Sequence, residues 1–311
     1  MNEQHLFTLF CKNLSKYVSG GSDCYVEFSD RDLWQRLTKV LRLRAGEKML
    51  LFDEHVNAAT VVQEKTFTKK ELLALYIESV NSNQAIKPNI TLMPCLLKKD
   101  AFEDIIYAAA QMGVNKIIPI LSDKVQRPWG EKKERERLFN IMVAACEQSK
   151  SFFLPEICEP VKIQDIAKQG NSLLLKPGAS PVGDGSTSSL PSLDSSFGGQ
   201  APRARQLDGA RPEPVEGCEF QKRSNAKPSL KIYFDPSGAC FVDLLKKIKE
   251  SNDQKNDYLD IILFFGPEGG LTGQEEKLLS DLGFETYALT PTILRAREAV
   301  IVGLGGVRSA R

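Results

Sequence analysis

The sequence predicts an α/β protein, and two features support this class. After the first third of the chain, short apolar runs alternate with helical patterns, as in a parallel sheet covered by helices. One run, Leu259 to Phe265, is interrupted only by Asp260 and ends in Gly266-Pro267-Glu268-Gly269-Gly270, directly before a helix start. A strand that stops in a glycine-rich loop can bring backbone N–H groups to a ligand at the sheet edge.

Residues 1–84 predict a small domain of short strands around one helix, with a small β-barrel as its expected form. Strands are expected at Tyr25–Phe28, Met49–Phe52, Ala59–Val62 and Leu72–Ile77. Asp30 is the expected N-cap of the helix, whose apolar stripe would consist of Leu33, Leu37, Val40 and Leu41. Because Asn81 to Pro88 is a polar connector, we place the domain boundary after residue 84.

Residues 85–311 predict a larger domain of alternating strands and helices. Ile90–Leu97 and Lys116–Leu121 are expected to be strands, and the helix between them is predicted to be capped by Asp100 and Glu103 and to end at Gly113. A longer helix follows, with one apolar face formed by Leu138, Ile141, Met142, Ala145 and Cys146. Further segments complete the sheet and the helices on its faces: Leu230–Phe234, Phe241–Ile248, Leu259–Phe265 and Glu285–Leu289.

The chain after the glycine-rich loop carries a well-marked helix start and then a second loop. Thr272 and Glu275 fit a capping box, in which hydroxyl and carboxylate satisfy each other's backbone N–H groups. Gly283 is the expected stop after an apolar stripe of Leu278, Leu279 and Leu282. The next strand ends in the loop Leu289–Arg295, which leads to a helix from Ala296. For the glycine-rich loop alone, a tight turn without a ligand stays open as the alternative.

The segment Pro177–Ser229 differs from the rest of the chain in composition. Its 53 residues contain seven Pro, seven Gly and nine Ser. Such a segment buries too little apolar surface to offset an ordering cost of about 1–2 kcal/mol per residue. We therefore expect 177–229 to be a disordered insert between two α/β elements. Contact with RNA through its arginines is the alternative: Arg203, Arg205 and Arg211.

Composition and charge bound the function. The formal net charge is only +1, but the segment from Arg31 to Lys48 contains six basic residues and only two acidic ones. This basic segment is either a phosphate-binding surface or a solvated helix face. The seven cysteines lack Cys-x-x-Cys spacing and only His5 and His55 are present, so no metal site is expected. Without a signal-peptide pattern or an apolar run of about 18 residues, we expect a cytoplasmic protein with no membrane contact.

These segments resemble the knotted SPOUT methyltransferases, and among them the RsmE-type enzymes that methylate N3 of a uridine in 16S ribosomal RNA. The most specific match is GPEGG at 266–270, followed by L-x-P-x-I-L-R at Leu289–Arg295. Weaker matches follow the order of the family: Val40–Glu47, Lys99-Asp100, Met112–Val114 and Glu147–Pro155. Apart from the insert, the resemblance covers nearly the whole chain.

The resemblance implies a C-terminal α/β trefoil-knot domain, an RNA-binding PUA-like domain at the N-terminus, and a homodimer. It implies that S-adenosylmethionine is held by three loops at strand ends: Phe234–Gly238, Gly266–Gly270 and Leu289–Leu294. The cofactor-binding residues carried over are Phe265, Gly266, Glu268, Gly269, Gly270, Leu289, Thr290, Ile293, Leu294 and Ala299. The implied partner is 16S rRNA or the 30S subunit.

Arg295 is the catalytic residue that the resemblance implies, since a cation can stabilise charge on the uracil oxygens; a helix-start arginine paired with a carboxylate is the alternative. RNA contacts are expected from Lys39, Arg42, Arg44, Lys98, Lys99, Lys124 and Arg127. The chain departs from the family after Arg295, where Ala296-Arg297-Glu298-Ala299 replaces Thr-Glu-Thr-Ala. Two other functions therefore stay open: an RNA-binding protein of this fold with weakened catalysis, and a SPOUT enzyme that acts on another RNA.

Overall fold

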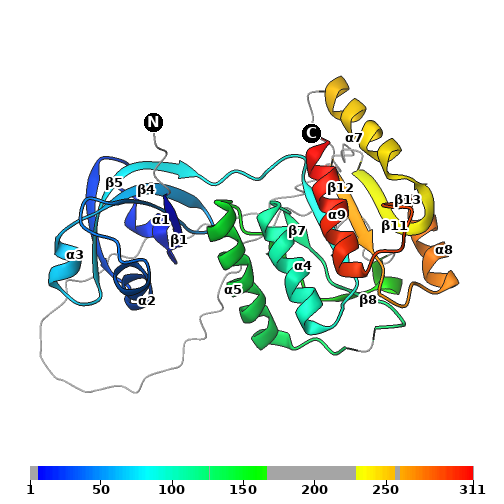
Figure 1. Cartoon of the computed structure of the whole chain (residues 1–311), viewed down its shortest axis with the longest axis horizontal. Helices are drawn as coiled ribbons and strands as arrows, with labels where there is room; N and C mark the ends of the chain where they lie inside the picture. Colours follow the sequence, from blue (N-terminus) through cyan, green and yellow to red (C-terminus); the bar gives the residue numbers. More distant parts are fainter. Residues whose placement is uncertain (1–5, 126, 167–228, 256–259, 311) are drawn as a thin grey trace, which may run out of the picture. The chain divides into compact units, whose positions relative to one another are not determined.

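The structure is a computed structural model that describes residues 6–125, 127–166, 229–255 and 260–310 (Figure 1). The predicted insert, including its arginines, lies outside the described residues except for Ser229. The strands of the described residues form a five-stranded sheet near the N-terminus, a six-stranded sheet in the rest of the chain, and a separate two-stranded pair.

The N-terminal sheet has the strand order β1-β3-β4-β5-β2. Its strands are β1 (Phe7–Phe10), β2 (Cys24–Ser29), β3 (Lys48–Phe52), β4 (Val56–Val62) and β5 (Leu72–Ser82). Neighbours are antiparallel except for β1 and β3. The four strands predicted here are confirmed, whereas β1 was not predicted. Because no pairing joins β1 to β2 in the part of the chain that is described, the closed barrel stays a prediction.

The helix after β2 begins as predicted but does not keep one face. Asp30 Oδ1 accepts the backbone N–H of Leu33 at 2.9 Å. Helix α2 (Arg31–Gln35) then continues as a π-helical turn, Arg36–Val40. A π turn contains an extra residue and rotates the side chains that follow. Val40 is therefore 72% exposed, and its predicted place on the apolar stripe is wrong. Two short helices complete this region: α1 (Leu14–Tyr17) and α3 (Lys65–Thr68).

The six-stranded sheet is parallel throughout, in the order β13-β11-β12-β6-β7-β9. Its strands are β6 (Ile90–Pro94), β7 (Lys116–Ile117), β9 (Glu156–Ile157), β11 (Ser229–Cys240), β12 (Asp260–Phe265) and β13 (Glu285–Ala288). The single strand predicted at Lys116–Leu121 is wrong, because β8 (Ile120–Leu121) pairs with β10 (Val161–Lys162) instead. Pro119 separates β7 from β8, since it has no N–H to donate to a strand ladder.

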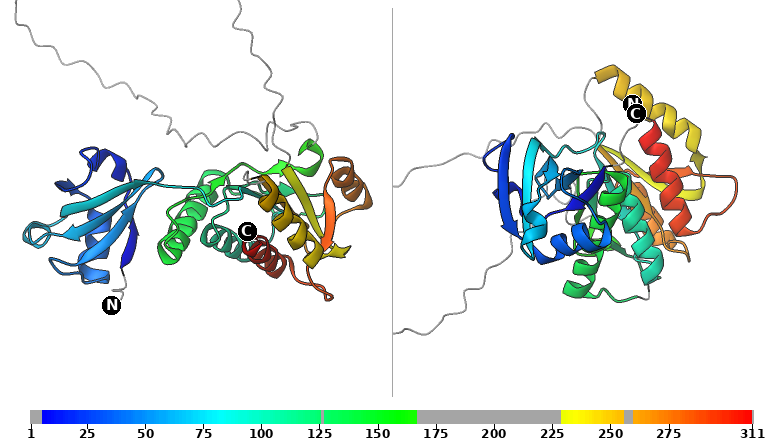
Figure 2. Two further views of the ribbon diagram at one scale, coloured as in Figure 1. Left: turned by 90° about the horizontal axis from the view of Figure 1, so that it is seen from above. Right: turned by 60° about the vertical axis from the view of Figure 1, so that its left-hand side comes forward.

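Helices cover both faces of this sheet (Figure 2). One face carries α4 (Lys99–Gln111), α5 (Glu131–Ser149), α7 (Phe241–Lys255) and α9 (Ala296–Ser309), and the other carries α8 (Gly273–Asp281). The side chains of β12 alternate between the two faces of the sheet. Leu263 and Phe265 pack in the core under α4, α5, α7 and α9, and Ile262 and Phe264 pack in the core under α8. A strand buried on both faces is typical of a parallel sheet. The predicted α/β class is confirmed.

The start of α4 differs from its prediction. The helix begins at Lys99, and its N-cap Lys98 makes no side-chain capping bond. Glu103 forms an ion pair with Arg137 of α5 instead. Asp100 and Glu103 are therefore not the caps, because the helix begins two residues earlier than the acidic pair requires. The predicted end at Gly113 is confirmed, and Gly113 has the positive φ of +64° that glycine adopts at low cost.

Candidate functional site

Strands β6, β12 and β13 end near one another at one edge of the large sheet, where β11 pairs with both β12 and β13. In the strand register, Phe234 of β11 lies opposite both Phe265 of β12 and Tyr287 of β13, and Phe265 lies opposite Pro94 of β6. The segments that follow these strands are therefore neighbours, although they are far apart in the sequence. The carboxyl edge of a parallel sheet is the usual ligand site in α/β proteins.

The glycine-rich loop after β12 has a conformation set by its own residues. The Gly270 N–H donates to Pro267 O at 2.9 Å, and Gly270 has a φ of +66° that favours glycine. The predicted capping box at the start of α8 is confirmed: Glu275 Oε2 accepts the Thr272 N–H at 2.7 Å, and Thr272 Oγ1 accepts the Glu275 N–H at 3.3 Å. Glu275 is only 2% exposed. The turn and the capping box together fix the path of the chain out of β12.

The loop after β13 is far less enclosed. Leu289 packs against the core, whereas Ile293 is 83% exposed. Thr290 Oγ1 donates to Thr292 O at 2.6 Å, and Leu294 is half-buried. Arg295 is the N-cap of α9 and is exposed, and among the described residues no hydrogen bond or ion pair engages its guanidinium. This loop therefore presents an apolar side chain and a cation to its surroundings.

The predicted cofactor segment Phe234–Gly238 is not a simple loop, and this expectation is corrected. Strand β11 continues to Cys240, with a register shift between Phe234 and Ala239. A Cβ at Gly238 would lie 2.5 Å from Tyr287 N of β13, so only glycine permits this backbone approach. Pairing with β13 resumes beyond the shift, which is why the strand is longer than predicted.

Two of the predicted cofactor residues lie at the core rather than on the surface. Phe265 is 2% exposed and stacks on Phe234 with ring centroids 4.8 Å apart. Gly303 of α9 covers this pair, since a Cβ there would lie 2.8 Å from Phe265 Cζ. Ala299, in the first turn of α9, is half-buried against the same core. Only the backbone of Phe265 can thus face a ligand, while Glu268, Gly269 and Gly270 are exposed.

A polar group links the predicted cofactor segment Phe234–Gly238 to the Tyr233 hydroxyl, and of its members only Tyr233 was not predicted. The Tyr233 hydroxyl donates to Asp235 Oδ2 at 3.2 Å, and Asp235 Oδ1 accepts from Ser237 N at 2.9 Å and Ser237 Oγ at 2.6 Å. Burial raises the pKa of the Tyr233 hydroxyl, and nearby Asp235 raises it further. These residues line a hollow of about 90 Å³ beside α8. Asp235-Pro236-Ser237-Gly238 is a typical turn sequence, and this was the available signal.

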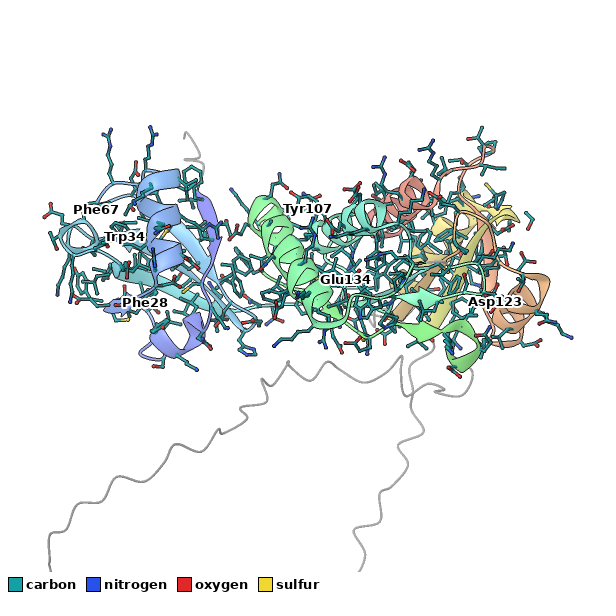
Figure 3. All side chains as sticks on the ribbon, turned by 90° about the horizontal axis from the view of Figure 1, so that it is seen from below. Phe28, Trp34, Phe67, Tyr107, Asp123 and Glu134 are labelled. Carbon is teal, nitrogen blue, oxygen red and sulfur yellow. The ribbon has the colours of Figure 1, made fainter. Side chains whose placement is uncertain are left out.

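The basic residues predicted near the sheet edge have different surroundings. Lys98 and Lys99 are exposed at the start of α4. Lys124 Nζ donates to Gly269 O at 2.7 Å and to Leu271 O at 3.2 Å. Arg127 forms an ion pair with Glu134, labelled in Figure 3, and lies over the Phe102 ring. The structure therefore brings Lys124 to the glycine-rich loop, while the Arg127 guanidinium is already paired.

The basic residues predicted in the N-terminal region belong to a different part of the chain. Lys39 Nζ lies 5.9 Å from the centroid of the Trp34 ring, and Arg42 and Arg44 are exposed. The same region contains a wide hollow of about 760 Å³, whose lining includes Tyr25 and Lys65. No residue of the two C-terminal loops lines this hollow. The large hollow is therefore not the ligand site predicted at the sheet edge.

The segment that departs from the family carries a charge cluster. Arg297 forms ion pairs with Asp104 of α4 at 2.8 Å and with Glu298 at 2.6 Å. The pKa of Glu298 is lowered, chiefly by the hydrogen bond from Arg297. Glu298 Oε2 is buried and has no hydrogen-bond partner among the described residues. The Arg297 guanidinium is therefore engaged in ion pairs, whereas among the described residues that of Arg295 forms none.

The described residues contain no group of three or more His, Cys, Asp or Glu side chains arranged to hold a metal ion. None of their helices is both long and apolar enough to cross a membrane.

The fold is that of an α/β protein whose parallel sheet carries two neighbouring loops at its carboxyl edge, the usual place for a ligand in this class. The family described as the RNA methyltransferase domain matches residues 85–196 and 214–307. The chain belongs to this family. The resemblance inferred from the GPEGG and L-x-P-x-I-L-R motifs is confirmed.

Two curated relatives of this chain carry the same name. The chain is 25% identical over 270 residues to the Ribosomal RNA small subunit methyltransferase E of Rickettsia conorii, a match that covers 86% of this chain and 83% of that protein. It is 23% identical over 227 residues to the protein of the same name from Mesomycoplasma hyopneumoniae, with coverages of 72% and 71%.

Solved structures share the fold. A methyltransferase from Legionella pneumophila, in complex with S-adenosylmethionine, matches with a TM-score of 0.65 and 20% identity over 99% of this chain and 98% of that one. The Ribosomal RNA small subunit methyltransferase E of Neisseria gonorrhoeae, also bound to S-adenosylmethionine, matches with a TM-score of 0.64 and 18% identity over 98% of each chain.

Proposed function

We propose that this protein is a methyltransferase that uses S-adenosylmethionine to form 3-methyluridine in 16S ribosomal RNA. The observation that carries the proposal is the edge at which β12 and β13 end, with the glycine-rich loop and the Leu289–Arg295 loop as near neighbours. Membership of the RNA methyltransferase family supports the reaction class. Two solved structures of the same fold hold this methyl donor.

The chemistry of the two loops suits a ligand without phosphate. S-adenosylmethionine offers an adenine edge and ribose hydroxyls, which backbone N–H and C=O groups of Gly266–Gly270 can bind. Leu289, Ile293 and Leu294 would form the apolar walls around the adenine. No lysine of the P-loop kind is needed for such a ligand, and the loop sequence has none.

Transfer to N3 forms a carbon–nitrogen bond while the bond from sulfonium sulfur to methyl carbon breaks, and the imide proton of N3 must leave to a base. The protein's main task is to align nitrogen, methyl carbon and sulfur. We assign Arg295 to the negative charge that develops on the uracil oxygens, since its guanidinium is exposed at the start of α9. The target uridine must be unpaired, because N3 lies on the Watson–Crick edge.

The finer parts of the proposal follow from the family. Residues 1–84 would be the PUA-like RNA-binding domain, with Lys39, Arg42 and Arg44 at its RNA surface, and residues 85–311 the trefoil-knot domain. Lys98 and Lys99 are exposed and would contact phosphates near the target, which in the family is uridine 1498. A homodimer would cover the exposed aliphatic side chains of Ile293, Ile301 and Val302.

A second candidate is an RNA-binding protein of the same fold that has lost transfer. The ion pairs that hold Arg297 favour it, because a residue of the altered family segment is engaged within the protein. Binding of S-adenosylmethionine with no turnover on any RNA would identify this second function.

The test is methyl transfer from labelled S-adenosylmethionine to 30S subunits that lack the modification, with the product nucleoside identified by mass spectrometry. The proposal predicts 3-methyluridine. A different methylated nucleoside would show that the site acts on another RNA position, and no product from protein that still binds the donor would favour the second candidate.

A further inference from the structure

The turn that follows β8 forms hydrogen bonds with the glycine-rich loop and with the start of α8. Lys124 Nζ donates to Gly269 O at 2.7 Å and Leu271 O at 3.2 Å. The N–H of the preceding residue, Asp123, which is labelled in Figure 3, donates to Glu275 Oε1 at 2.9 Å. The Asp123 carboxylate in turn accepts from Gln164 Nε2 at 2.8 Å. Two neighbouring residues therefore anchor both the loop and the capping carboxylate of the helix that follows it.

These bonds fix two peptide units at both ends. The Gly269 carbonyl and the Gly270 N–H belong to one planar unit; the first accepts from Lys124 and the second donates to Pro267 O at 2.9 Å. The next anchored unit joins the Leu271 carbonyl to the Thr272 N–H, which donates to Glu275 Oε2 at 2.7 Å. Neither unit can rotate without losing two hydrogen bonds.

The anchoring leaves the other side of the loop for a ligand. In the described residues, the backbone N–H groups of Glu268 and Gly269 have no hydrogen-bond acceptor. The N–H groups of Glu268 and Gly269 come just before the fixed Gly269–Gly270 peptide unit, so the directions in which they point depend on that unit. A charge-assisted hydrogen bond is stronger than a neutral one, and an ammonium with three donors can serve two carbonyls together.

We propose that Lys124 is a positioning residue for the methyl donor. Its ammonium holds the carbonyls of Gly269 and Leu271 outward, so that the N–H groups of Glu268 and Gly269 face S-adenosylmethionine in the binding geometry. The identity of the ligand rests on the proposed function, whereas the anchoring of the loop does not. This role differs from the RNA contact predicted for Lys124, which stays a prediction.

The experiment compares Lys124→Met, which keeps the aliphatic stem but loses the ammonium, with Lys124→Arg, which keeps a cation. Lys277→Met is the matched control, since Lys277 is an exposed lysine of α8. Titration calorimetry with S-adenosylmethionine should give a Kd about tenfold higher for Lys124→Met, and values close to wild type for the other two. In turnover assays, KM for the donor should rise while kcat is kept.

Hydrogen exchange of the free protein tests the anchoring without any ligand. The segment 267–272 should exchange faster in Lys124→Met than in wild type, with the melting temperature unchanged. Unchanged exchange and unchanged donor affinity would overturn the proposal, as would a loss of RNA affinity with donor affinity intact. If wild type binds no S-adenosylmethionine, the proposed function fails, but the exchange result still decides the role of Lys124.

Discussion

The two loops at the sheet edge differ in how much the protein itself fixes them. The loop after β12 is held by the positive φ of Gly270, by buried Glu275 and by the Lys124 ammonium. The loop after β13 leaves Ile293 83% exposed, and among the described residues the Arg295 guanidinium forms no hydrogen bond or ion pair and acts on Glu298 only through its charge. We infer that the first loop is formed before the ligand binds, and that the second is completed by the ligand or by a second copy of the chain.

The largest effect is expected from Arg295→Ala, because it removes the free cation of the open loop. Methyl transfer should fall about a hundredfold, the loss typical of a missing charge-stabilising donor. Donor affinity and the free energy of unfolding should not change, since the side chain is exposed. Arg295→Lys, which keeps a charge, should recover part of the rate. Single-turnover assays measure the effect, and a wild-type rate in Arg295→Ala would remove Arg295 from catalysis.

Glu275→Ala should be the most damaging change in the anchored loop. It removes the acceptor of the Thr272 and Asp123 N–H groups at a site that is 2% exposed. Hydrogen bonds to a buried carboxylate suggest a loss of about 2 kcal/mol in the free energy of unfolding. Urea unfolding measures it. A loss no larger than that of an exposed control, Glu276→Ala, would show that the loop is not anchored through this residue.

Gly270→Ala tests backbone conformation alone, since a Cβ there would meet no atom within 4 Å. The positive φ of +66° should make it cost about 1 kcal/mol in the free energy of unfolding. Gly273→Ala is the matched control, because its added Cβ also meets open space but its backbone is helical. We expect that control to be neutral or slightly stabilising. Equal unfolding midpoints for the two variants would contradict a strained glycine.

The smallest effect on unfolding is expected from Ile293→Ser, because the side chain makes little contact in the single chain. The free energy of unfolding should change by less than about 0.5 kcal/mol. Sedimentation should nevertheless show a weaker dimer, since the change removes apolar surface from the proposed interface. Val40→Ser, at another exposed aliphatic residue, should leave the sedimentation mass of the dimer unchanged. A monomeric wild-type protein would contradict the dimer outright.

Sequence reasoning succeeded where the determinants are local. The Thr272–Glu275 capping box and the stop at Gly113 each depend on a few neighbouring residues, and both are confirmed. The apolar run of β12 predicted a strand, but its length and periodicity do not tell which helices cover each face of that strand. The family motifs located both loops without any knowledge of their contacts.

Sequence reasoning failed where partners lie far apart in the chain. Lys124 bonds to Gly269 across 145 positions, and nothing near either residue indicates the contact. Gly303 and Gly306 are poor helix formers within α9, but a Cβ at these positions would lie 2.8 Å from Phe265 and 2.4 Å from Phe241. Helix propensity contains no information about such close packing. The continuation of β11 past Asp235-Pro236 was missed for the same reason, because β13 provides the pairing.

The most direct test of the site is hydrogen exchange of the wild-type protein with and without saturating S-adenosylmethionine. We expect new protection in both loops, large at 289–295 and smaller at 266–271, because segment 266–271 is already held by internal hydrogen bonds. Protection confined to other parts of the chain, such as the hollow lined by Tyr25 and Lys65, would contradict the assignment of the methyl-donor site to this sheet edge.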